Sequence, residues 1–310
     1  MDTPLRILVT GANGQLGRSL QALAAPLAGR IHYAFTDRDS LDITSDAAIG
    51  RWLDAHPADC LVNAAAYTAV DRAADELDTA LAINAQAPAL LARHCARRGM
   101  RLLHVSTDYV FDGTLDRPYR ADDPTRPLNT YGRSKRQGEE AVLQAAPDAL
   151  VVRTSWVFSA WGDNFVRTML RLGQQRDHLR VIDDQVGGPT WAGHLAQALH
   201  QLAQRLHTPG LHTPGGLYHF SGTPDVSWHG FAREIFTQAV ARGMLARAPA
   251  LAPIPASDWP SPEPRPANSR LDCDKLEALL GPLERDWRIG LGRVLDAWRD
   301  DAPPRTETLR

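Results

Sequence analysis

Apolar and polar positions follow a repeating arrangement through the first half of the chain. Short, continuously apolar runs predict strands at residues 5–11, 31–37, 59–66, 101–108 and 149–155. Between them, apolar residues recur at helical spacing and predict helices over 14–27, 44–56 and 76–99. We expect Thr44 or Ser45 to cap the second helix and Gly99 to end the third. Because the strand runs do not alternate with polar residues, the pattern predicts an α/β protein whose parallel sheet is covered by helices on both faces.

The alternation weakens after about residue 156. Helical spacing returns at 164–175, 192–206, 271–281 and 289–300, and strands are expected near 179–190 and 216–222. The proline-rich stretch 247–266 predicts an extended segment with at most a short strand. We therefore expect a larger domain and a smaller, interleaved α/β domain. The larger one would span residues 1–156 with 191–220 returning to it, and the smaller one 157–190 and 221–310.

Composition narrows the functional classes. The chain has 310 residues, of which 44% are apolar and 23% charged, as in an ordinary globular protein. Its formal net charge of −2 provides no strong attraction to nucleic acid or to an anionic membrane, and we expect neither as a partner. The three cysteines are widely spaced without a CxxC, which argues against a disulfide framework or a zinc site. Neither a signal peptide nor a run of ~20 apolar residues is recognisable, so a cytoplasmic location is expected.

A glycine-rich loop joins the first predicted strand to the first predicted helix. It reads TGANGQLG, with glycines at 11, 14 and 17. Gly11 would permit the tight turn, Gly14 the approach of a pyrophosphate, and Gly17 close packing of helix and strand. The first N–H groups of the helix would then face the anion. An ordinary turn is the alternative, but the strand–turn–helix context favours a dinucleotide site in a Rossmann-type, doubly wound sheet.

An acidic residue stands where the second predicted strand ends. Asp37 lies ~20 residues beyond the glycine loop, the spacing at which an acid contacts the adenosine ribose. Arg38 follows it and could pair with a 2′-phosphate, so both NADPH and NADH are compatible with the sequence. An exposed turn is the alternative for this pair. Asp42 and Ile43 are weaker candidates for holding and covering the adenine. The three alanines of NAAAYT at 63–68 either leave room for a ligand after the third strand or are a packing choice.

A tyrosine and a lysine four residues apart lie between the fourth and fifth predicted strands. Tyr131 and Lys135 would share one face of a helix, either as an exposed pair or as a proton-delivery unit. Ser106 and Thr107 end the fourth strand, so their hydroxyls would emerge at the carboxyl edge of the sheet. Carbonyl reduction by a nicotinamide needs a proton for the developing alkoxide. A nearby ammonium would lower the tyrosine pKa, and the threonine hydroxyl would polarise the carbonyl.

Longer motifs identify a family. The chain resembles the extended short-chain dehydrogenase/reductase superfamily, and within it the dTDP-4-dehydrorhamnose reductase family. The resemblance runs from residue 11 to about 272, and the motifs after the glycine loop are NAAAYTAVDRAADE, STDYVFDGTLDRPY, PLNTYGRSKRQGE, VVRTSWVFSAWGDNFVRTML, DQVGGPT, GLYHFSG and RPANSRLD.

The resemblance implies a reaction and residue roles. Members reduce the 4-keto group of dTDP-4-dehydro-β-L-rhamnose with NADPH or NADH, and the product serves lipopolysaccharide or cell-wall polysaccharide synthesis. It makes Tyr131 the proton donor, Lys135 the residue that binds the cofactor ribose and tunes Tyr131, and Thr107 the polarising group. Substrate contacts would be Thr107, Asp108, Trp156, Arg265 and Asn268, and the smaller domain would bind the nucleotide sugar. Cofactor contacts would be Gly11, Asn13, Gly14, Gln15, Leu16, Asp37, Arg38, Asp42, Ile43, Ala65, Ala66, Tyr67, Thr68, Ser106, Tyr131 and Lys135.

Several alternatives accompany these expectations. Trp156 could be an ordinary core residue, and Arg265 could cap a helix or brace a loop. A related nucleotide-sugar epimerase remains open, whereas a dehydratase is disfavoured because Tyr109 follows Asp108 where dehydratases carry a glutamate. A non-catalytic protein like the regulatory subunit of methionine adenosyltransferase is a further alternative.

The same resemblance raises the question of a metal. Some members form dimers around Mg²⁺ held by glutamates, but the matching positions here are Ser19 and Gly193. Neither residue can offer a carboxylate to a hard cation. We therefore expect no metal, and a monomer or weak homodimer in place of a Mg²⁺-bridged dimer.

Overall fold

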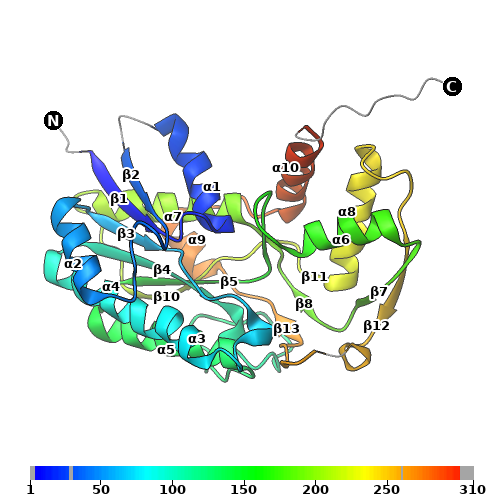
Figure 1. Ribbon diagram of the computed structural model, residues 1–310, viewed down its shortest axis with the longest axis horizontal. Coiled ribbons are helices and arrows are strands. Elements are labelled where there is room, and N and C mark those ends of the chain that lie inside the picture. The colour runs from blue at the N-terminus through cyan, green and yellow to red at the C-terminus, as the bar shows by residue number, and fades with distance from the viewer. Residues whose placement is uncertain (1–3, 28–30, 260, 301–310) are drawn as a thin grey trace.

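The larger part of the protein is a six-stranded, wholly parallel sheet (Figure 1). The computed structural model describes residues 4–27, 31–259 and 261–300. The sheet order is β10-β5-β4-β3-β1-β2. The strand bounds are Leu5–Thr10 for β1, Ile31–Thr36 for β2, Cys60–Asn63 for β3, Arg101–Thr107 for β4, Leu150–Thr154 for β5 and Gly216–His219 for β10. All six strands lie within runs that the sequence predicts to be strands.

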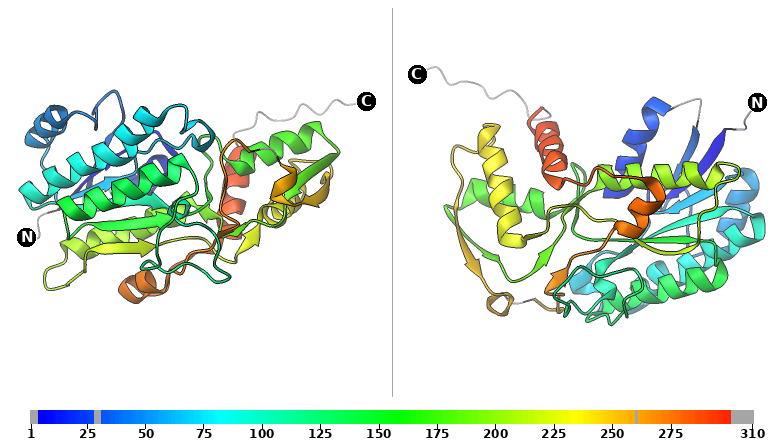
Figure 2. Two further views of the ribbon diagram at one scale, coloured as in Figure 1. Left: turned by 90° about the horizontal axis from the view of Figure 1, so that it is seen from below. Right: turned by 180° about the vertical axis from the view of Figure 1, so that it is seen from behind.

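Helices cover both faces of this sheet (Figures 1 and 2). One face packs against α1 (Gln15–Ala24), α7 (Ala192–His207) and α9 (Asp274–Leu280) through side chains such as Ile7 and Val9. The other face packs against α2 (Asp46–Ala55), α4 (Ala87–Arg98) and α5 (Thr130–Ala145) through side chains such as Leu8. Side chains of successive strand residues thus pack into the hydrophobic cores on opposite faces of the sheet, which explains why the strands are apolar at nearly every position. The predicted doubly wound α/β class is confirmed.

Helix ends follow the predicted signals in two places. Ser45 caps α2 by accepting a hydrogen bond from the Ala48 N–H, and Gly99 ends α4 with a φ of 66°. The helix predicted over 76–99 is interrupted, however. It consists of α3 (Leu77–Leu81), the π-helical turn η3 (Ala82–Gln86) and α4. Its wide turn carries the buried Asn84, whose amide bonds both backbone polar groups of Tyr67.

A smaller part of the structure stands beside the carboxyl ends of the strands (Figure 1). It has three small sheets, ordered β11-β8-β13, β12-β7 and β6-β9. The bounds are Val157–Phe158 for β6, Phe165–Gln175 for α6, His178–Ile182 for β7, Val186–Gly187 for β8, Thr190–Trp191 for β9, Val226–Ser227 for β11, Trp228–Ala241 for α8, Ala250–Ile254 for β12, Asn268–Ser269 for β13 and Trp287–Asp300 for α10. Its own core includes Phe158, Val166, Phe231, Phe236 and Trp287. The expected single short strand in 247–266 is β12.

Helix α8 is absent from the sequence-based expectation. The sequence nevertheless contains the usual features of a helix here. Ser227 caps α8, and Phe231, Ile235 and Ala239 recur at helical spacing on its buried side. The division into two domains with the predicted limits stays a prediction, and residues 1–3 and 301–310 of those limits lie outside the described residues.

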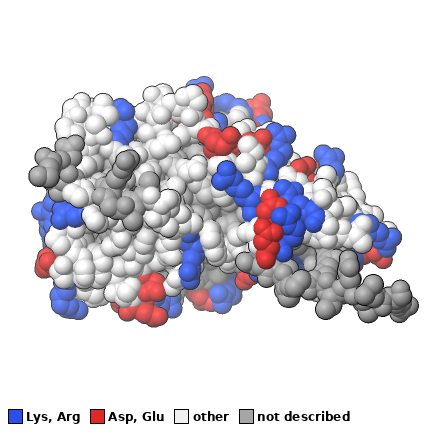
Figure 3. Space-filling view, turned by 90° about the horizontal axis from the view of Figure 1, so that it is seen from above, with Lys and Arg blue, Asp and Glu red and all other residues white. Residues whose placement is uncertain are grey.

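Four short 3₁₀ turns complete the described chain: η1 (Ala25–Leu27), η2 (Val70–Arg72), η4 (Asp108–Val110) and η5 (Ala256–Asp258). On the face shown in Figure 3, basic and acidic side chains lie next to one another over the part that carries α8 and α10. Among the described residues, no helix is long and apolar enough to cross a membrane.

Strand order fixes where a ligand can enter. Strands β2 and β3 lie on opposite sides of β1, so the winding of the sheet reverses between β1 and β3. In open parallel sheets the connecting loops separate at such a point and leave a crevice at the carboxyl ends of the strands.

Candidate active site

The glycine loop lies at this crevice and needs its glycines. Gly11 has a φ of +76°, and a Cβ there would lie 2.6 Å from the Ala65 nitrogen. A Cβ on Gly17 would lie 2.2 Å from the Gly11 oxygen, so α1 could not pack this closely with any larger residue. Helix α1 starts after Gly14 without a side-chain cap, which leaves its first N–H groups available to an anion.

A cavity of about 780 Å³ opens beside this loop. Nine of the predicted cofactor residues line it: Gly11, Asn13, Gly14, Asp37, Arg38, Asp42, Ile43, Ala65 and Ala66. Ala64, another small residue of the NAAAYT stretch, lines it as well. The sequence did not predict the remaining lining residues, which are Thr36, Leu41, Thr44, Asp78, Thr79, Ala82 and Ile83. Four of these come from α3 and η3, which reach the crevice only through tertiary folding. The cavity suits the adenosine and pyrophosphate portion of a dinucleotide.

The Asp37–Arg38 pair lies directly after β2, and hydrogen bonds fix the position of Asp37. Asn13 donates a 2.8 Å hydrogen bond to Asp37, and hydrogen bonds from Ser40 hold the Asp37 pKa below its usual value. Arg38 forms no ion pair with any described residue, so its guanidinium is available to a ligand. The Asp42 carboxylate accepts hydrogen bonds from the backbone and hydroxyl of Thr44.

Seven other predicted cofactor residues do not line this cavity: Gln15, Leu16, Tyr67, Thr68, Ser106, Tyr131 and Lys135. Gln15 points to the smaller part of the structure, where its side-chain oxygen accepts from Ser159 and Asn164 at 3.1 Å. Leu16 belongs to the core, and Tyr67 packs in the cluster that contains Tyr131. The backbone of Gln15 and Leu16 still starts α1, so a cofactor contact of these residues, and of Thr68, stays a prediction.

Tyr131 lies on α5, which packs very closely against the η4 turn after β4. Asn129 caps α5 through a 2.8 Å hydrogen bond from the Gly132 N–H. A Cβ on Gly132 would lie 2.2 Å from the Tyr109 oxygen, so glycine lets α5 touch the η4 turn that follows β4. As a result the Tyr131 ring meets Tyr109 edge-on at 5.5 Å, and Thr107 is close enough to Tyr131 to act on its pKa. The structure therefore brings Tyr131 and Thr107 together, and their catalytic roles stay a prediction.

The electrostatics of this pair differ from the expectation. Burial raises the pKa of Tyr131, and the hydrogen bond with Thr107 offsets this only in part. The Lys135 ammonium instead donates a 2.8 Å hydrogen bond to the Val105 carbonyl, and burial lowers the pKa of Lys135 to about 8. Lys135 is not among the groups that shift the Tyr131 pKa, so the net shift is opposite to the predicted one. A phenol with a raised pKa carries its proton at neutral pH, as a proton donor must.

Asp108 adds a buried carboxyl group next to the pair. Thr107 donates a 3.1 Å hydrogen bond to its Oδ1, whereas its Oδ2 is buried without a partner in the described chain. Burial raises the Asp108 pKa to about 6, and a hydrogen bond from Ser269 opposes the rise. Ser269 was not predicted, and its contact joins the smaller part of the structure to the end of β4.

Other polar atoms near the carboxyl edge are also buried without a described partner. They are Ser106 Oγ, His104 Nε2 and Thr154 Oγ1. Buried polar groups normally have a hydrogen-bond partner, so such a concentration points to a polar ligand. His104 also belongs to a missed chain of hydrogen bonds in which Asn63 links it to Thr10 across three neighbouring strands.

Replacing Asp108 by Asn should stabilise the folded protein at neutral pH. A pKa raised from 3.8 to about 6 costs the ionised folded state about 3 kcal/mol, at about 1.4 kcal/mol per tenfold change in proton affinity. The folded state binds the proton more tightly, so this cost is complete above pH 6 and disappears as the pH falls towards 4. We expect Asp108→Asn to gain about 1–3 kcal/mol in urea unfolding at pH 7 and to lose this gain near pH 4.

A matched control is Asp112→Asn. Hydrogen bonds from Tyr119 and Thr114 lower the Asp112 pKa, so this variant should lose stability at pH 7. If both variants changed stability in the same direction, the proposed burial cost at Asp108 would be wrong.

Trp156 has a strained backbone. Its φ of 47° lies in the left-handed region that a bulky residue seldom adopts, at a cost of about 1–3 kcal/mol. Its indole stacks on Trp228 with centroids 3.5 Å apart and lies against Gly187. The ring is only partly buried, so a contact with the sugar stays a prediction that the strain supports.

The two residues predicted to bind the nucleotide, Arg265 and Asn268, differ in how far their side chains are already hydrogen-bonded. Arg265 contacts both carboxylate oxygens of Asp71 at 2.9 Å, and its Nε is buried without a described partner. Asn268 donates to the carbonyls of Leu115 and Arg117, and its oxygen accepts from Arg270. Its amide thus braces β13 against the loop after β4. Substrate contacts of both residues stay predictions.

The positions considered for a metal have other roles. The Ser19 hydroxyl donates to the Gln15 carbonyl within α1, and a Cβ on Gly193 would lie 2.4 Å from the Trp191 ring. No group of three or more potential metal-ligating side chains occurs in residues 4–27, 31–259 and 261–300. A metal-free protein stays a prediction.

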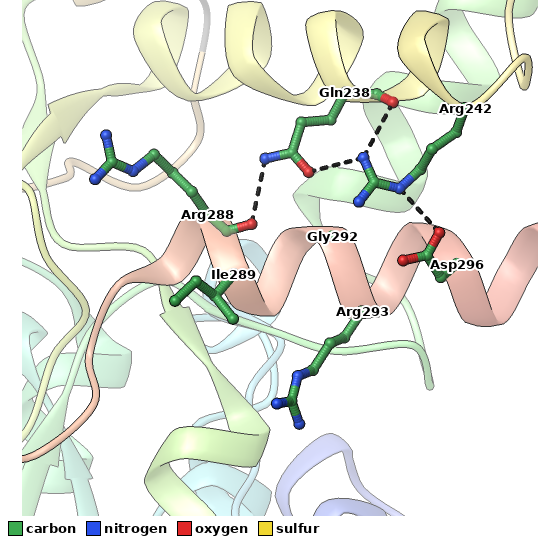
Figure 4. Close-up of a pocket in the computed structure, with 7 residues that line it drawn as sticks. All are labelled: Gln238, Arg242, Arg288, Ile289, Gly292, Arg293 and Asp296. Carbon is green, nitrogen blue, oxygen red and sulfur yellow. Dashed lines mark hydrogen bonds and ion pairs between the residues drawn. The ribbon is translucent and has the colours of Figure 1, made fainter.

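A hollow of about 440 Å³ lies between α8 and α10 (Figure 4). Three of its polar side chains pair with one another, while the Arg288 guanidinium pairs with Asp286 and Arg293 lies over the Trp191 ring. Arg242 contacts Asp296 at 3.0 Å and Gln238 at 3.1 Å, and Gln238 donates to the Arg288 carbonyl. We assign no ligand to it.

Comparisons with known proteins give the family. The chain matches the family model described as RmlD substrate binding domain over residues 5–299. A dTDP-4-dehydrorhamnose reductase from Aggregatibacter actinomycetemcomitans is 42% identical over 289 residues, covering 93% of this chain and 98% of the relative. A probable dTDP-4,6-dihydroxy-2-methyloxan-3-one 4-ketoreductase from Streptomyces antibioticus is 40% identical over 305 residues, covering 97% and 98%. The crystal structure of dTDP-4-dehydrorhamnose reductase from Bacillus anthracis in complex with NADP is 32% identical, with a TM-score of 0.86 and coverage of 95% and 100%.

Proposed function

The chain belongs to the RmlD substrate binding domain family, and from this premise we propose that it reduces the 4-keto group of dTDP-4-dehydro-β-L-rhamnose to give dTDP-L-rhamnose. One observation carries the proposal. The buried Tyr131 phenol meets the Thr107 hydroxyl at the same sheet edge as the crevice at Gly11 and Ala65. A proton donor and a dinucleotide crevice on one edge are what carbonyl reduction requires.

The residues divide the chemistry as follows. A bound nicotinamide supplies the hydride. Thr107 donates a hydrogen bond to the keto oxygen and stabilises the negative charge that develops there. Tyr131 transfers its phenolic proton to that oxygen. Lys135 holds the nicotinamide ribose through its buried ammonium, which remains largely protonated below pH 8.

The cofactor site supports a dinucleotide with or without a 2′-phosphate. The Asp37 carboxylate can accept a ribose hydroxyl, and Arg38 can pair with a phosphate. We therefore propose that both NADH and NADPH serve as reductants. The Bacillus anthracis relative is in complex with NADP.

A second candidate is the reduction of a different dTDP-4-keto sugar. The 40% identical relative from Streptomyces antibioticus carries the name of such a ketoreductase. A purely regulatory role receives less support, because Thr107, Tyr131 and Lys135 are all present and buried. Epimerisation receives less support because relatives that are 36–42% identical carry the name of a reductase.

An assay with both reactants tests the proposal. NADPH and dTDP-4-dehydro-β-L-rhamnose should lose the absorbance of reduced nicotinamide when the purified protein is added, and dTDP-L-rhamnose should accumulate. A control reaction without nucleotide sugar should keep its NADPH. If the absorbance fell only with another dTDP-4-keto sugar, the second candidate would replace the first. No loss with any of these sugars would reject both.

A further inference from the structure

Two tryptophans that are far apart in the sequence lie face to face where the smaller part meets the six-stranded sheet. The Trp156 and Trp228 rings have centroids 3.5 Å apart and planes within 11° of each other. Non-bonded carbon atoms attract one another best at about 3.5–4.0 Å, so this short separation means that the two ring faces overlap almost completely. Trp156 comes shortly after β5, whereas Trp228 is the first residue of α8.

Trp156 lies close to the groups proposed to bind the keto sugar. Strand β5 pairs with β4 as far as Thr107, and Trp156 stands two residues beyond the end of β5. The Trp156 ring also lies against Gly187, where a Cβ would be 2.9 Å from the indole. Gly187 pairs with Ser269, which is close enough to Asp108 to lower its pKa. The indole of Trp156 therefore borders the space in which Thr107 and Asp108 would meet the sugar.

The conformation of Trp156 depends on its surroundings. Its φ of 47° is one that a bulky residue seldom adopts, and such a backbone persists only where neighbouring groups fix it. The Thr190 N–H donates a 3.1 Å hydrogen bond to the Trp156 carbonyl and holds the backbone. Gly187 and Trp228 contact the side chain and restrict where the indole can lie.

Trp228 is anchored in the smaller part of the structure. It directly follows β11, which pairs with β8 in the small sheet that also contains Gly187 (Figure 1). Ser227 caps α8 by accepting a 3.0 Å hydrogen bond from the Gly230 N–H, and the Phe165 ring packs against Trp228 with centroids 4.6 Å apart. Trp156 and Trp228 are both only partly buried, so the stacked pair lies at the margin of the core and not inside it.

We propose that Trp228 is a positioning residue that holds the Trp156 indole against the sugar ring of the substrate. An indole offers a flat apolar face, which suits the C–H bonds of a hexose that carries a methyl group. Without the stack, the Trp156 side chain would take several orientations and lose part of this contact. Trp228 therefore sets the affinity for the sugar and leaves the affinity for the nucleotide unchanged. This inference rests on the proposed function, because it takes the sugar to lie beside Thr107.

The test compares two ligands that differ in the sugar. The NADPH-loaded protein is titrated calorimetrically with dTDP-L-rhamnose, the proposed product, and separately with dTDP. We expect Trp228→Leu to weaken dTDP-L-rhamnose binding by about 5- to 10-fold, the size of an aromatic stacking contribution, and dTDP binding by less than about 2-fold. KM for the keto sugar should rise by a similar factor as dTDP-L-rhamnose binding weakens. Trp228→Phe keeps an aromatic face and should retain most of the affinity.

Further variants show whether Trp228 acts through Trp156. Trp156→Ala should itself weaken dTDP-L-rhamnose binding, and adding Trp228→Leu to it should cause no further loss. Trp52→Leu is the matched control, because Trp52 is also partly buried and stacks on the His56 ring, at α2. It should leave both affinities unchanged. If Trp228→Leu does not fold, Trp228→Met takes its place, because a flexible thioether fills irregular gaps.

The outcomes separate the positioning role from the proposed function. Equal weakening of both ligands by Trp228→Leu, or no weakening of either, overturns the positioning role, and turnover by wild type then still supports the reductase. Unaltered binding in Trp156→Ala, or additive losses in the double variant, overturns it as well, because Trp228 would not act through Trp156. The expected binding pattern without turnover of the keto sugar supports the positioning role and rejects the reductase. Wild type that binds neither ligand contradicts both.

Discussion

Replacing Tyr131 by Phe should lower kcat by about 10²- to 10⁴-fold while the fold and cofactor affinity persist. A general acid contributes typically this much, and phenylalanine lacks only the phenolic hydroxyl, whose proton the alkoxide must receive. The ring would still pack against Tyr67 and Tyr109, because those contacts involve the aromatic carbons. Steady-state kinetics with the keto sugar and a separate NADPH titration measure the two effects.

Tyr109→Phe is the matched control for this variant. Tyr109 is a neighbouring tyrosine whose ring contacts that of Tyr131, and it is not part of the proposed proton transfer. We expect its kcat to remain within a few-fold of wild type. Equal losses in the two variants, or near-wild-type turnover by Tyr131→Phe, would reject the proposed proton donor.

Replacing Glu139 by Gln should cost about 3–5 kcal/mol of folding free energy. Glu139 lies on α5, one turn beyond Lys135, and receives two hydrogen bonds of 2.8 and 2.7 Å from Arg153 on β5. Both side chains are almost fully buried, and Arg153 also lies over the Phe111 ring. The variant would leave a buried guanidinium without a counter-charge, which is far more costly than losing an exposed ion pair. Urea unfolding measures the change.

The neighbouring residue Glu140 provides a control for the Glu139→Gln variant. Glu140 pairs with Arg136 on the exposed side of α5, so Glu140→Gln should cost no more than about 0.5 kcal/mol. A double variant that replaces Glu139 by Leu and Arg153 by Met should recover much of the loss, because it removes both buried charges. A similar small effect of Glu139→Gln and Glu140→Gln would show that the buried pair does not hold α5 in place.

The features that could be predicted from the sequence are those that a short stretch of residues determines. The strands, the glycine loop and the Tyr131–Lys135 spacing each lie within a short stretch, where periodicity and turn chemistry are visible. Residues that reach the site from elsewhere leave no such pattern. Asp78 and Thr79 join the dinucleotide cavity, and Ser269 joins Asp108, only because the chain folds back on itself.

Electrostatic effects were harder to anticipate than positions. The spacing placed Lys135 one turn from Tyr131, but it could not show that the ammonium turns to the Val105 carbonyl. Nor could it show that burial would dominate the pKa of Tyr131 and Asp108. Burial is a property of the assembled core, so the direction of these shifts required the structure.

Label transfer from the cofactor to the sugar tests the central claim most directly. The protein is supplied with the keto sugar and NADPH that carries deuterium at the transferable position of nicotinamide C4, and the product is analysed by NMR. We expect deuterium on C4 of the new sugar alcohol with wild type and almost no product with Tyr131→Phe. Deuterium retained in the cofactor, released to solvent or found on another sugar carbon would contradict this claim.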